Sequence, residues 1–400
     1  MKIQVHVFPM KLFDVAKQQG RVLYCAAPMV RYSKVSLSFY SIVFAIAPFA
    51  SCEVWKLCSW VFDMKPLAYL AFRQTVANYG VDLTWTPMIL AKEFNRSILA
   101  RDSDFTTSPS PTPTIAQLGV NSPLEISRTT TFLAPFTNGI DINCGCPQSW
   151  ACADLLGAAL MSHPTLVSSM IASAKSTLQT LSLTSSFISS DKESEGYKTV
   201  SVKIRIHKDL RKTLDFVREV ENAGVDFITV HGRMRSTRSS EPVNLDAIKL
   251  VKEHARVPIV ANGDVFSRAD VERIVSETGV DGVMSARGLL EEPGLFARSP
   301  TLTTSKNHSA AVGEGSDDDQ SQDNRWEVLE TFLNNVIRAP IPFKLVVHHI
   351  SEMVGSDRLQ TGRGLIGTLF TKEERAALME CKSFLEVLDL VDGVRGVRRF

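Results

Sequence analysis

A run of eight residues near the middle of the chain, Asp141-Ile-Asn-Cys-Gly-Cys-Pro-Gln148, has the residue types best suited to chemistry. Pro147 fixes its own φ angle and disfavours a helical backbone at the residue before it, while Gly145 frees the turn from side-chain clashes. The thiol of Cys146 is therefore expected on a rigid turn after a buried strand. An ordinary thiol has a pKa of about 8.5 and is mostly protonated at neutral pH, so Cys146 can serve as a general acid as well as a nucleophile.

The cysteines of this region do not form a zinc-binding pattern. Cys144, Cys146 and Cys152 have no second Cys/His pair nearby at the spacing that zinc sites use. No metal site is therefore predicted. Cys144 is interpreted as a buried structural residue, because free cysteine commonly packs like a small apolar side chain.

Four further apolar runs each end in polar residues. In residues 199–206, Lys203 and Arg205 alternate with apolar residues, so a strand would place both cations on one face. The alternative is an edge strand with a solvated basic face. A single His or Asn after a strand is more often a turn or cap residue than a ligand, so it is the shared position of these residues that indicates a site. The other three runs lead into His231-Gly-Arg233, Asn262-Gly-Asp264 and Ala286-Arg-Gly288.

Helical patterns of suitable length separate these runs. Gly224 and Gly279 are placed to end two of the helices, and Ser267 is expected to cap the start of one. The alternation of strand, polar turn and helix predicts an α/β fold with a parallel sheet, and in a (β/α)8 barrel the site lies at the carboxyl ends of the strands. The helices are expected over residues 210–223, 245–254 and 267–278.

The last two of these strands are expected to border a phosphate. Gly263 and Gly288 each follow one of them, and loops after the last two barrel strands commonly bind a phosphate group. Arg287 would balance its charge, and the glycines would let backbone N–H groups approach it closely. Neither G-x-G-x-x-G nor a Walker motif is present, which disfavours a Rossmann domain or a P-loop. A phosphorylated cofactor is therefore predicted.

Taken together, these motifs resemble those of the tRNA-dihydrouridine synthases. The resemblance covers most of residues 21–298, and the form Asn-Cys-Gly-Cys-Pro-Gln is similar to that of the eukaryotic branch that modifies positions 20a and 20b of the tRNA D-loop. The motifs that carry it are Ala27-Pro28-Met29-Val30, Ile115-Ala-Gln117, Asp141 to Gln148, Val202 to Arg205, His231-Gly-Arg233, Asn262-Gly-Asp264 and Ala286-Arg-Gly288.

The resemblance implies an oxidoreductase acting on CH–CH groups, in which NADPH reduces FMN and the reduced flavin reduces uridine in tRNA to dihydrouridine. Cys146 matches the catalytic cysteine of the family and would donate the proton to C5, on the face opposite the hydride at C6. A cation such as Lys203 suits the negative charge of reduced flavin. By the same match, the residues that would bind FMN are Pro28, Met29, Val30, Gln117, Lys203, His231, Asn262, Gly263, Asp264, Ala286 and Arg287.

The overall charge of the chain does not by itself point to RNA. Lys and Arg number 44 against 43 Asp and Glu, a formal net charge of +1. Contacts with tRNA phosphates must therefore be local, and the basic clusters at 231–238 and 394–400 are the candidates, with a merely solvated surface as the alternative. Gln148 and the loop from Arg233 to Arg238 are expected to face the substrate. The target base must turn out of the folded tRNA to be reached.

The length of the chain and a change in composition predict two domains. Residues 21–298 would form the FMN-binding barrel. Residues 299–325 are rich in Ser, Thr, Asp and Gly and are predicted to be a disordered linker. Residues 326–400 would form a small helical domain, which the resemblance assigns to tRNA binding, with helices over 326–337, 342–354 and 372–391.

Residues 35–69 depart from the family pattern, which would run from Tyr32-Ser-Lys34 directly into Leu70-Ala-Phe-Arg73. The segment is apolar and aromatic, without strand or helix periodicity. Glu53 and Lys56 interrupt it before about 20 apolar residues accumulate, so no membrane span is predicted. The clean return of the pattern at Leu70 suggests that 35–69 is translated intron sequence, which sequencing of the mature transcript would test.

The seven cysteines are scattered and odd in number, which predicts a reducing compartment. No targeting signal is recognised, so the cytoplasm or nucleus is expected. Two other functions stay open at this point. One is a different FMN barrel, similar to a dihydroorotate dehydrogenase and acting on a free pyrimidine. The other is an RNA-binding protein whose catalysis the insertion has disabled.

Overall fold

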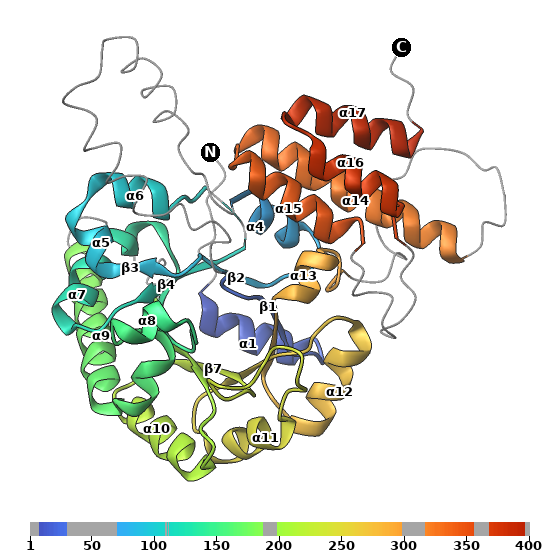
Figure 1. Cartoon of the computed structure of the whole chain (residues 1–400). Coiled ribbons are helices and arrows are strands. Elements are labelled where there is room, and N and C mark those ends of the chain that lie inside the picture. The colour runs from blue at the N-terminus through green and yellow to red at the C-terminus, as the bar shows by residue number, and fades with distance from the viewer. Residues whose placement is uncertain are drawn as a thin grey trace, which may run out of the picture.

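Parallel strands form a closed barrel at the centre of the molecule (Figure 1). The structure, a computed structural model, describes residues 8–29, 70–108, 110, 112–186, 198–297, 317–355 and 368–396. Within these residues eight strands form the ring, because β2 pairs with β4 and β9 returns to pair with β1, while β3 is a short strand beside β4. The predicted (β/α)8 barrel is confirmed. The strands are β1 (Leu23–Ala26), β2 (Leu83–Trp85), β3 (Ile89–Leu90), β4 (Thr114–Gly119), β5 (Gly139–Cys144), β6 (Thr199–Arg205), β7 (Phe227–His231), β8 (Ile259–Asn262) and β9 (Gly282–Ser285).

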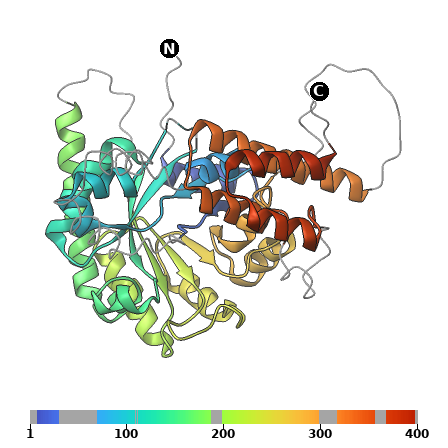
Figure 2. The same cartoon turned by 45° about the horizontal axis from the view of Figure 1, so that its top comes forward.

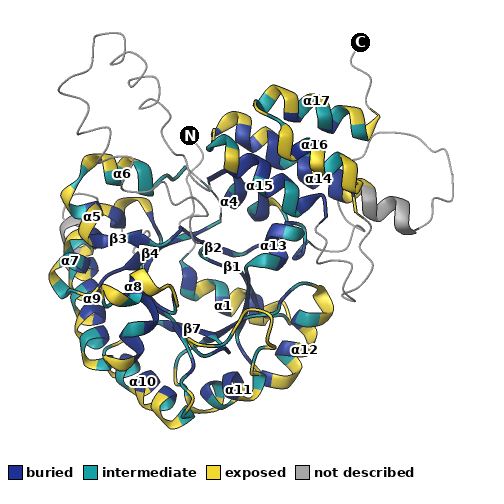
Figure 3. Ribbon diagram, in the orientation of Figure 1, coloured by how far each residue is buried: buried dark blue, intermediate teal, exposed yellow. Residues whose placement is uncertain are grey.

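Helices alternate with these strands and surround the barrel, with their buried faces turned toward it (Figure 3). The three predicted helices are present, each within one residue of the expected bounds. α12 begins with a capping box between Ser267 and Asp270 and ends at Gly279, whose φ of +66° suits glycine. The helices are α4 (Leu70–Asn78), α5 (Ala91–Arg96), α6 (Ile98–Asp104), α7 (Pro123–Leu133), α8 (Ser149–Ala153), α9 (Pro164–Ser186), α10 (Leu210–Asn222), α11 (Leu245–His254), α12 (Arg268–Thr278) and α13 (Arg287–Glu291), with the 3-10 helices η2 (Ala134–Phe136) and η3 (Gly157–Ser162).

The helix α1 (Pro9–Gln18) closes the amino-terminal end of the barrel. Its Phe13 ring lies 5.5 Å from that of Phe227, the first residue of β7. Phe13 also belongs to an apolar cluster with Leu23 and Leu83, the first residues of β1 and β2. Because the amino-terminal end is filled in this way, the opposite end is left for the site.

The C-terminal helices gather on one side of the barrel, beside α4 (Figure 2). They are α14 (Asp317–Arg338), α15 (Phe343–Met353), α16 (Lys372–Glu380) and α17 (Phe384–Arg395). Asn335 Nδ2 donates to Thr75 Oγ1 at 3.0 Å, and this bond is buried. The ring of His349 stacks on that of Phe72 at 4.9 Å. These helices therefore share one continuous core with the barrel.

The structure corrects one predicted helix and limits other predictions. The single helix expected over 372–391 is wrong, because Ser383 caps a new helix by accepting from Glu386 N at 3.2 Å. α14 begins at Asp317, inside the segment predicted to be a linker, and the rest of that segment lies outside the described residues, as do Val30 and 35–69. The domain boundaries stay predictions.

In the described part of the chain no single helix is long and apolar enough to cross a membrane, although the bent pair 149–162 and 164–182 passes by length and composition.

Candidate active site

The turn that carries Cys146 is closed by the side chain of Asn143. β5 is buried along its whole length and ends at Cys144. Asn143 Oδ1 accepts hydrogen bonds from the backbone N–H groups of Gly145 at 3.0 Å and Cys146 at 2.9 Å. Such a local side-chain bond replaces the ladder bonds that the strand no longer makes. The rigid turn predicted after a buried strand is therefore present.

A second segment holds the same turn from outside. Ala158 N donates to the carbonyl oxygen of Cys146 at 2.9 Å. Gly157 sits at a φ of +61°, and a Cβ atom there would lie 2.5 Å from that oxygen. Only glycine permits this approach, so η3 and the Cys146 turn form one unit.

The Cys146 thiol lies in an environment that keeps it protonated. The residue is 5% exposed, and burial raises the pKa of its thiol above the ordinary value. The backbone N–H of Gln148 and the charge of Arg205 act in the opposite direction by favouring the thiolate. A protonated thiol with groups ready to stabilise its conjugate base suits a general acid. Among the described residues no group of three or more His, Cys, Asp and Glu could hold a metal ion.

A chain of buried hydrogen bonds lies beneath this turn. Asn143 Nδ2 donates to Gln117 Oε1 at 2.7 Å, and Gln117 Nε2 donates to Asp141 Oδ2 at 2.7 Å. The other carboxylate oxygen of Asp141 accepts from Ser201 Oγ at 2.7 Å. Burial raises the pKa of Asp141 to about 6, even though the bonds from Gln117 and Ser201 lower it. The register of β4, β5 and β6 places these side chains in adjacent strands.

Lys203 projects from the middle of the barrel wall. β6 lies between β5 and β7, so the alternative of a solvated edge strand is excluded. Lys203 Nζ donates to Asn262 Oδ1 at 2.6 Å. Burial lowers its pKa to about 8, and the neighbouring Arg205 adds to this effect. An ammonium whose pKa is lowered in this way would be stabilised by an incoming anion.

Arg205, two residues further along β6, ties two loops together. Its Nε donates to the carbonyl of Gly145 at 2.7 Å, and its Nη1 donates to the carbonyl of Met234 at 2.9 Å. The turn of Cys146 and the basic loop 231–238 are therefore held at a fixed separation by one guanidinium.

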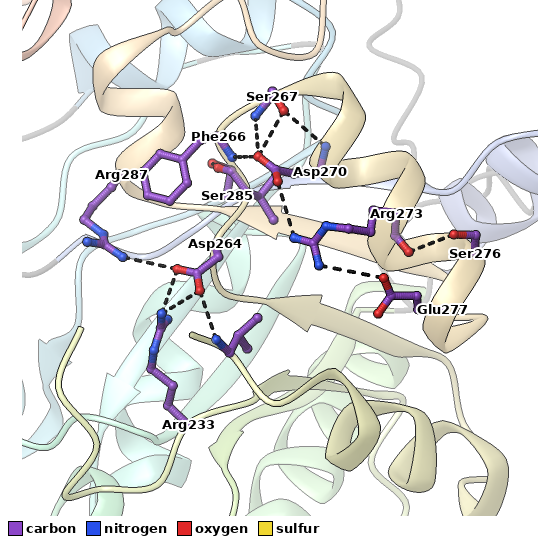
Figure 4. Close-up of polar contacts among 12 residues, drawn as sticks. Arg233, Asp264, Phe266, Ser267, Asp270, Arg273, Ser276, Glu277, Ser285 and Arg287 are labelled. Atoms are coloured by element: carbon purple, nitrogen blue, oxygen red, sulfur yellow. Dashed lines mark hydrogen bonds and ion pairs between the residues drawn. The ribbon is translucent and has the colours of Figure 1, made fainter. Parts of the chain in front are cut away.

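Asp264 lies between two arginines beyond the end of β8 (Figure 4). Arg233 Nη2 donates to both of its carboxylate oxygens, at 2.7 and 2.6 Å, and Arg287 Nη2 lies 3.5 Å from Oδ1. Val243 N also donates to this carboxylate at 3.0 Å. Because the carboxylate is occupied, Asp264 can meet a phosphate only through its backbone or through the arginines that it holds. Its φ of +52° is unusual for a residue other than glycine.

The site carries a surplus of positive charge. The pKa of His231 is lowered to about 2, mainly by burial and further by nearby cations. Asp264 and Asp141 only partly balance these cations. The donor set therefore fits an anionic group such as a phosphate or a reduced flavin. The cations are Lys203, Arg205, Arg233 and Arg287.

Two glycines allow the backbone to approach such a group. Gly263 has a φ of +123°, and a Cβ atom there would lie 2.9 Å from Val243 Cγ2. A Cβ atom on Gly288 would lie 2.0 Å from the carbonyl oxygen of Val265. Larger residues are excluded at both positions, so the narrow path of the chain after β8 and β9 depends on them.

Comparison with known proteins identifies the family. A family profile described as Dihydrouridine synthase (Dus) matches residues 63–359. This chain belongs to the dihydrouridine synthase family. It is 35% identical over 391 residues to a Schizosaccharomyces pombe protein named tRNA-dihydrouridine(20a/20b) synthase, NAD(P)+, covering 98% of this chain and 93% of that one. A Saccharomyces cerevisiae protein of the same name is 33% identical and covers 93% and 80%. A Mus musculus protein named as similar to that synthase is 45% identical over 252 residues, covering 63% and 72%.

The structure brings together most of the residues that sequence reasoning assigned to this dihydrouridine synthase. Gln117 lies in β4, and Cys146 follows the neighbouring strand β5. Ala27 N donates to Ser285 O at 2.9 Å, which places Pro28 and Met29 beside the end of β9. Their roles toward FMN stay predictions. Lys203 lies within β6, and the residues that end or follow β7 to β9 are His231, Asn262, Gly263, Asp264, Ala286 and Arg287.

Sequence reasoning missed the side chains that position the others. Asn143, Asp141 and Ser201 form the buried network, and Arg205 joins the loops. The signal was present for two of them, because Asp141 and Asn143 alternate along β5 and so share one face of a strand in which apolar residues occupy the other face.

Proposed function

We propose that this chain is an FMN-dependent tRNA-dihydrouridine synthase that reduces uridines 20a and 20b of the tRNA D-loop with NADPH as reductant. The observation that carries the proposal is Cys146. Its thiol is buried and has a raised pKa, and Asn143 and Gly157 hold the turn that carries it. This turn lies at the same end of the barrel as a group of cations. The family membership and the names of the fungal relatives support the same reaction.

Reduction of the C5–C6 double bond of uridine requires one hydride and one proton. When bound and reduced, FMN would supply the hydride to C6. Cys146 would supply the proton to C5 and become a thiolate. Gln148 N–H and the charge of Arg205 favour that thiolate, so the residues that surround Cys146 also stabilise its conjugate base. Asn143 holds the backbone of the turn that carries Cys146.

The cation group would serve cofactor binding. Arg287 and Arg233 are held by Asp264 after the last strands, where the glycines at 263 and 288 open the backbone to a phosphate. Lys203 lies deeper and would balance the negative charge of the reduced flavin. Gln117 uses its amide oxygen on Asn143 and one amide proton on Asp141, which leaves its second amide proton for a flavin.

The substrate and the cellular location follow from the same proposal. A uridine in folded tRNA must turn outward to reach Cys146, and local phosphate contacts must compensate for a net charge of only +1. We further propose a reducing compartment such as the cytoplasm or nucleus, because the seven cysteines of the sequence are scattered and odd in number.

The first experiment is to purify the chain and record its visible spectrum before and after NADPH. Bound flavin that bleaches with NADPH is expected. The protein is then incubated with tRNA lacking dihydrouridine, and the modified positions are mapped by mass spectrometry of nuclease fragments. Dihydrouridine at 20a and 20b supports the proposal. Flavin reduction without any dihydrouridine in tRNA, but with turnover of a free pyrimidine, would contradict it.

A further inference from the structure

A pocket of about 640 Å³ opens beside the turn of Cys146. Its lining comes from Pro147 and from three segments, 158–163, 205–208 and 234–236. These segments are η3 with the residue after it, the last residue of β6 with the three residues that follow it, and the loop after β7. Pockets that take small ligands commonly have volumes of about 300–1,000 Å³, so this one has room for a nucleotide.

The floor of this pocket is apolar. Met161 and Ile206 are buried, and Met234 is half-buried and packs against the core. Methionine is flexible and polarisable and packs well against an aromatic ring. The three apolar side chains offer a nucleobase a surface on which to pack.

The rim is cationic. Lys208 and Arg235 are exposed, and none of the residues that line the pocket is acidic. No described Asp or Glu forms an ion pair with Lys208 or Arg235, whereas many of the other described basic side chains do have such partners. Two unneutralised cations above an apolar floor match the two parts of a nucleotide, its phosphate and its base.

The pocket shares a wall with the candidate active site. Pro147 follows Cys146 directly, and Arg205, which lines the pocket, donates to Gly145 O at 2.7 Å. A group in the pocket would therefore lie next to a base held at Cys146. Consecutive nucleotides are covalently linked, and enzymes that turn a base outward commonly contact the nucleotides that flank it.

We propose that this pocket binds the RNA nucleotide adjacent to the target uridine, with its base on Met161, Ile206 and Met234 and its phosphate on Lys208 and Arg235. The inference rests on the proposed function and extends it, because it assigns contact with the flanking sequence to the barrel itself. Specificity for the base of that nucleotide would then come from how well the base fits the pocket rather than from the charges on the rim.

The test compares three variants of the full chain. Lys208→Glu/Arg235→Glu reverses the rim charge, and Ala159→Phe fills the pocket without changing charge. Lys212→Glu is the matched control, since Lys212 is exposed on α10 close to Lys208 but does not line the pocket. The Kd for tRNA is measured over a range of salt concentrations. The KM for NADPH is measured separately, without tRNA, from NADPH oxidation in air.

The rim double variant is expected to weaken tRNA binding by at least about tenfold and to reduce the slope of log Kd against log salt by about one to two. Ala159→Phe is expected to weaken binding without changing that slope. NADPH oxidation should stay unchanged in both, which also shows that they fold. Lys212→Glu should match the wild type within about threefold.

Two results would overturn the inference. One is a tRNA affinity in the pocket variants equal to that of Lys212→Glu. The other is a raised KM for NADPH with unchanged tRNA affinity, which would assign the pocket to the dinucleotide. A wild-type protein that forms no dihydrouridine contradicts the proposed function instead, so the two failures are distinguishable.

Discussion

The side-chain amide nitrogen of Gln117 donates a 2.7 Å hydrogen bond to the carboxylate of Asp141, and both side chains are buried. This bond determines which end of the Gln117 amide faces Asn143. The Gln117 oxygen accepts from Asn143 Nδ2, which turns Asn143 Oδ1 toward the backbone N–H of Cys146. The orientation of the turn that carries Cys146 is thus set by the carboxylate of Asp141, through a network whose bonds support one another.

Asp141→Asn should stabilise the folded protein but slow dihydrouridine formation. The folded pKa of Asp141, about 6, lies above its unfolded value, so its contribution to stability is lost as pH rises through 6. At pH 7 the neutral variant should therefore gain up to about 3 kcal/mol in the free energy of unfolding, and this gain should vanish below about pH 4. Dihydrouridine formation should fall about tenfold, because Gln117 loses its charged partner.

Denaturant unfolding at several pH values and single-turnover assays measure both effects. Ser201→Ala is the matched control, because it removes a donor and keeps the carboxylate. It should lower stability at pH 7. A destabilised Asp141→Asn protein at that pH would show that the carboxylate contributes to folding and would disprove the argument.

Cys146→Ala should separate the two halves of the reaction. FMN binding and NADPH oxidation should stay within about twofold of wild type, while uridine reduction should fall at least about 100-fold, the range of a lost general acid. The visible spectrum and dihydrouridine yield measure the two halves. Cys152→Ala, which removes a half-buried thiol from the same segment, should keep both activities. Equal loss of flavin from Cys146→Ala would assign that thiol a structural role.

FMN binding should weaken in alkali through Lys203. Because the pKa of Lys203 is about 8 in the free protein, and an anionic ligand favours its charged form, FMN binding takes up a proton above pH 8. The Kd for FMN should then rise up to about tenfold per pH unit between about 8 and 10. Lys203→Arg stays charged throughout and should bind with a flat pH profile. Parallel profiles for the two proteins would exclude Lys203 as the titrating group.

His349 should weaken the protein in acid. Burial lowers its pKa to about 3, and the neighbouring His348 adds to this effect. Since the folded pKa lies below the ordinary value near 6.5, its contribution is complete above pH 6.5 and is lost as pH falls from there toward 3. The stability of wild type should therefore fall more steeply than that of His349→Phe, by about 1.4 kcal/mol per pH unit. Equal slopes in urea unfolding between pH 6 and 4 would refute this assignment.

The barrel could be predicted from the sequence because its signals are local. Each strand from β6 to β9 is a short apolar run, and Gly279 and Ser267 mark the ends of α12. The break between α16 and α17 was missed because the apolar pattern continues across it, so the cap at Ser383 was the only local sign. α1 was not predicted, because the role of its Phe13 is a tertiary contact: the ring fills the amino-terminal end of the barrel.

The candidate site, too, could be predicted only in part. Cys146 and Lys203 were predicted from motifs next to strand ends. The network beneath them was not, because Asp141 meets Gln117 across 24 positions of the chain and Ser201 across 60. Those contacts depend on the register between strands, which the apolar pattern of any one strand does not contain.

The pairing of β1 with β9 also affects how the chain folds during translation. Leu23 lies opposite Gly282, and Thr75 bonds to Asn335 across 260 positions. At about 5–20 residues per second, a ribosome would leave the edge of β1 without its partner for on the order of ten seconds or more. An unpaired strand edge is a template for aggregation. The nascent chain should therefore need a chaperone on its first strands until the ninth has emerged, and the C-terminal helices should dock last.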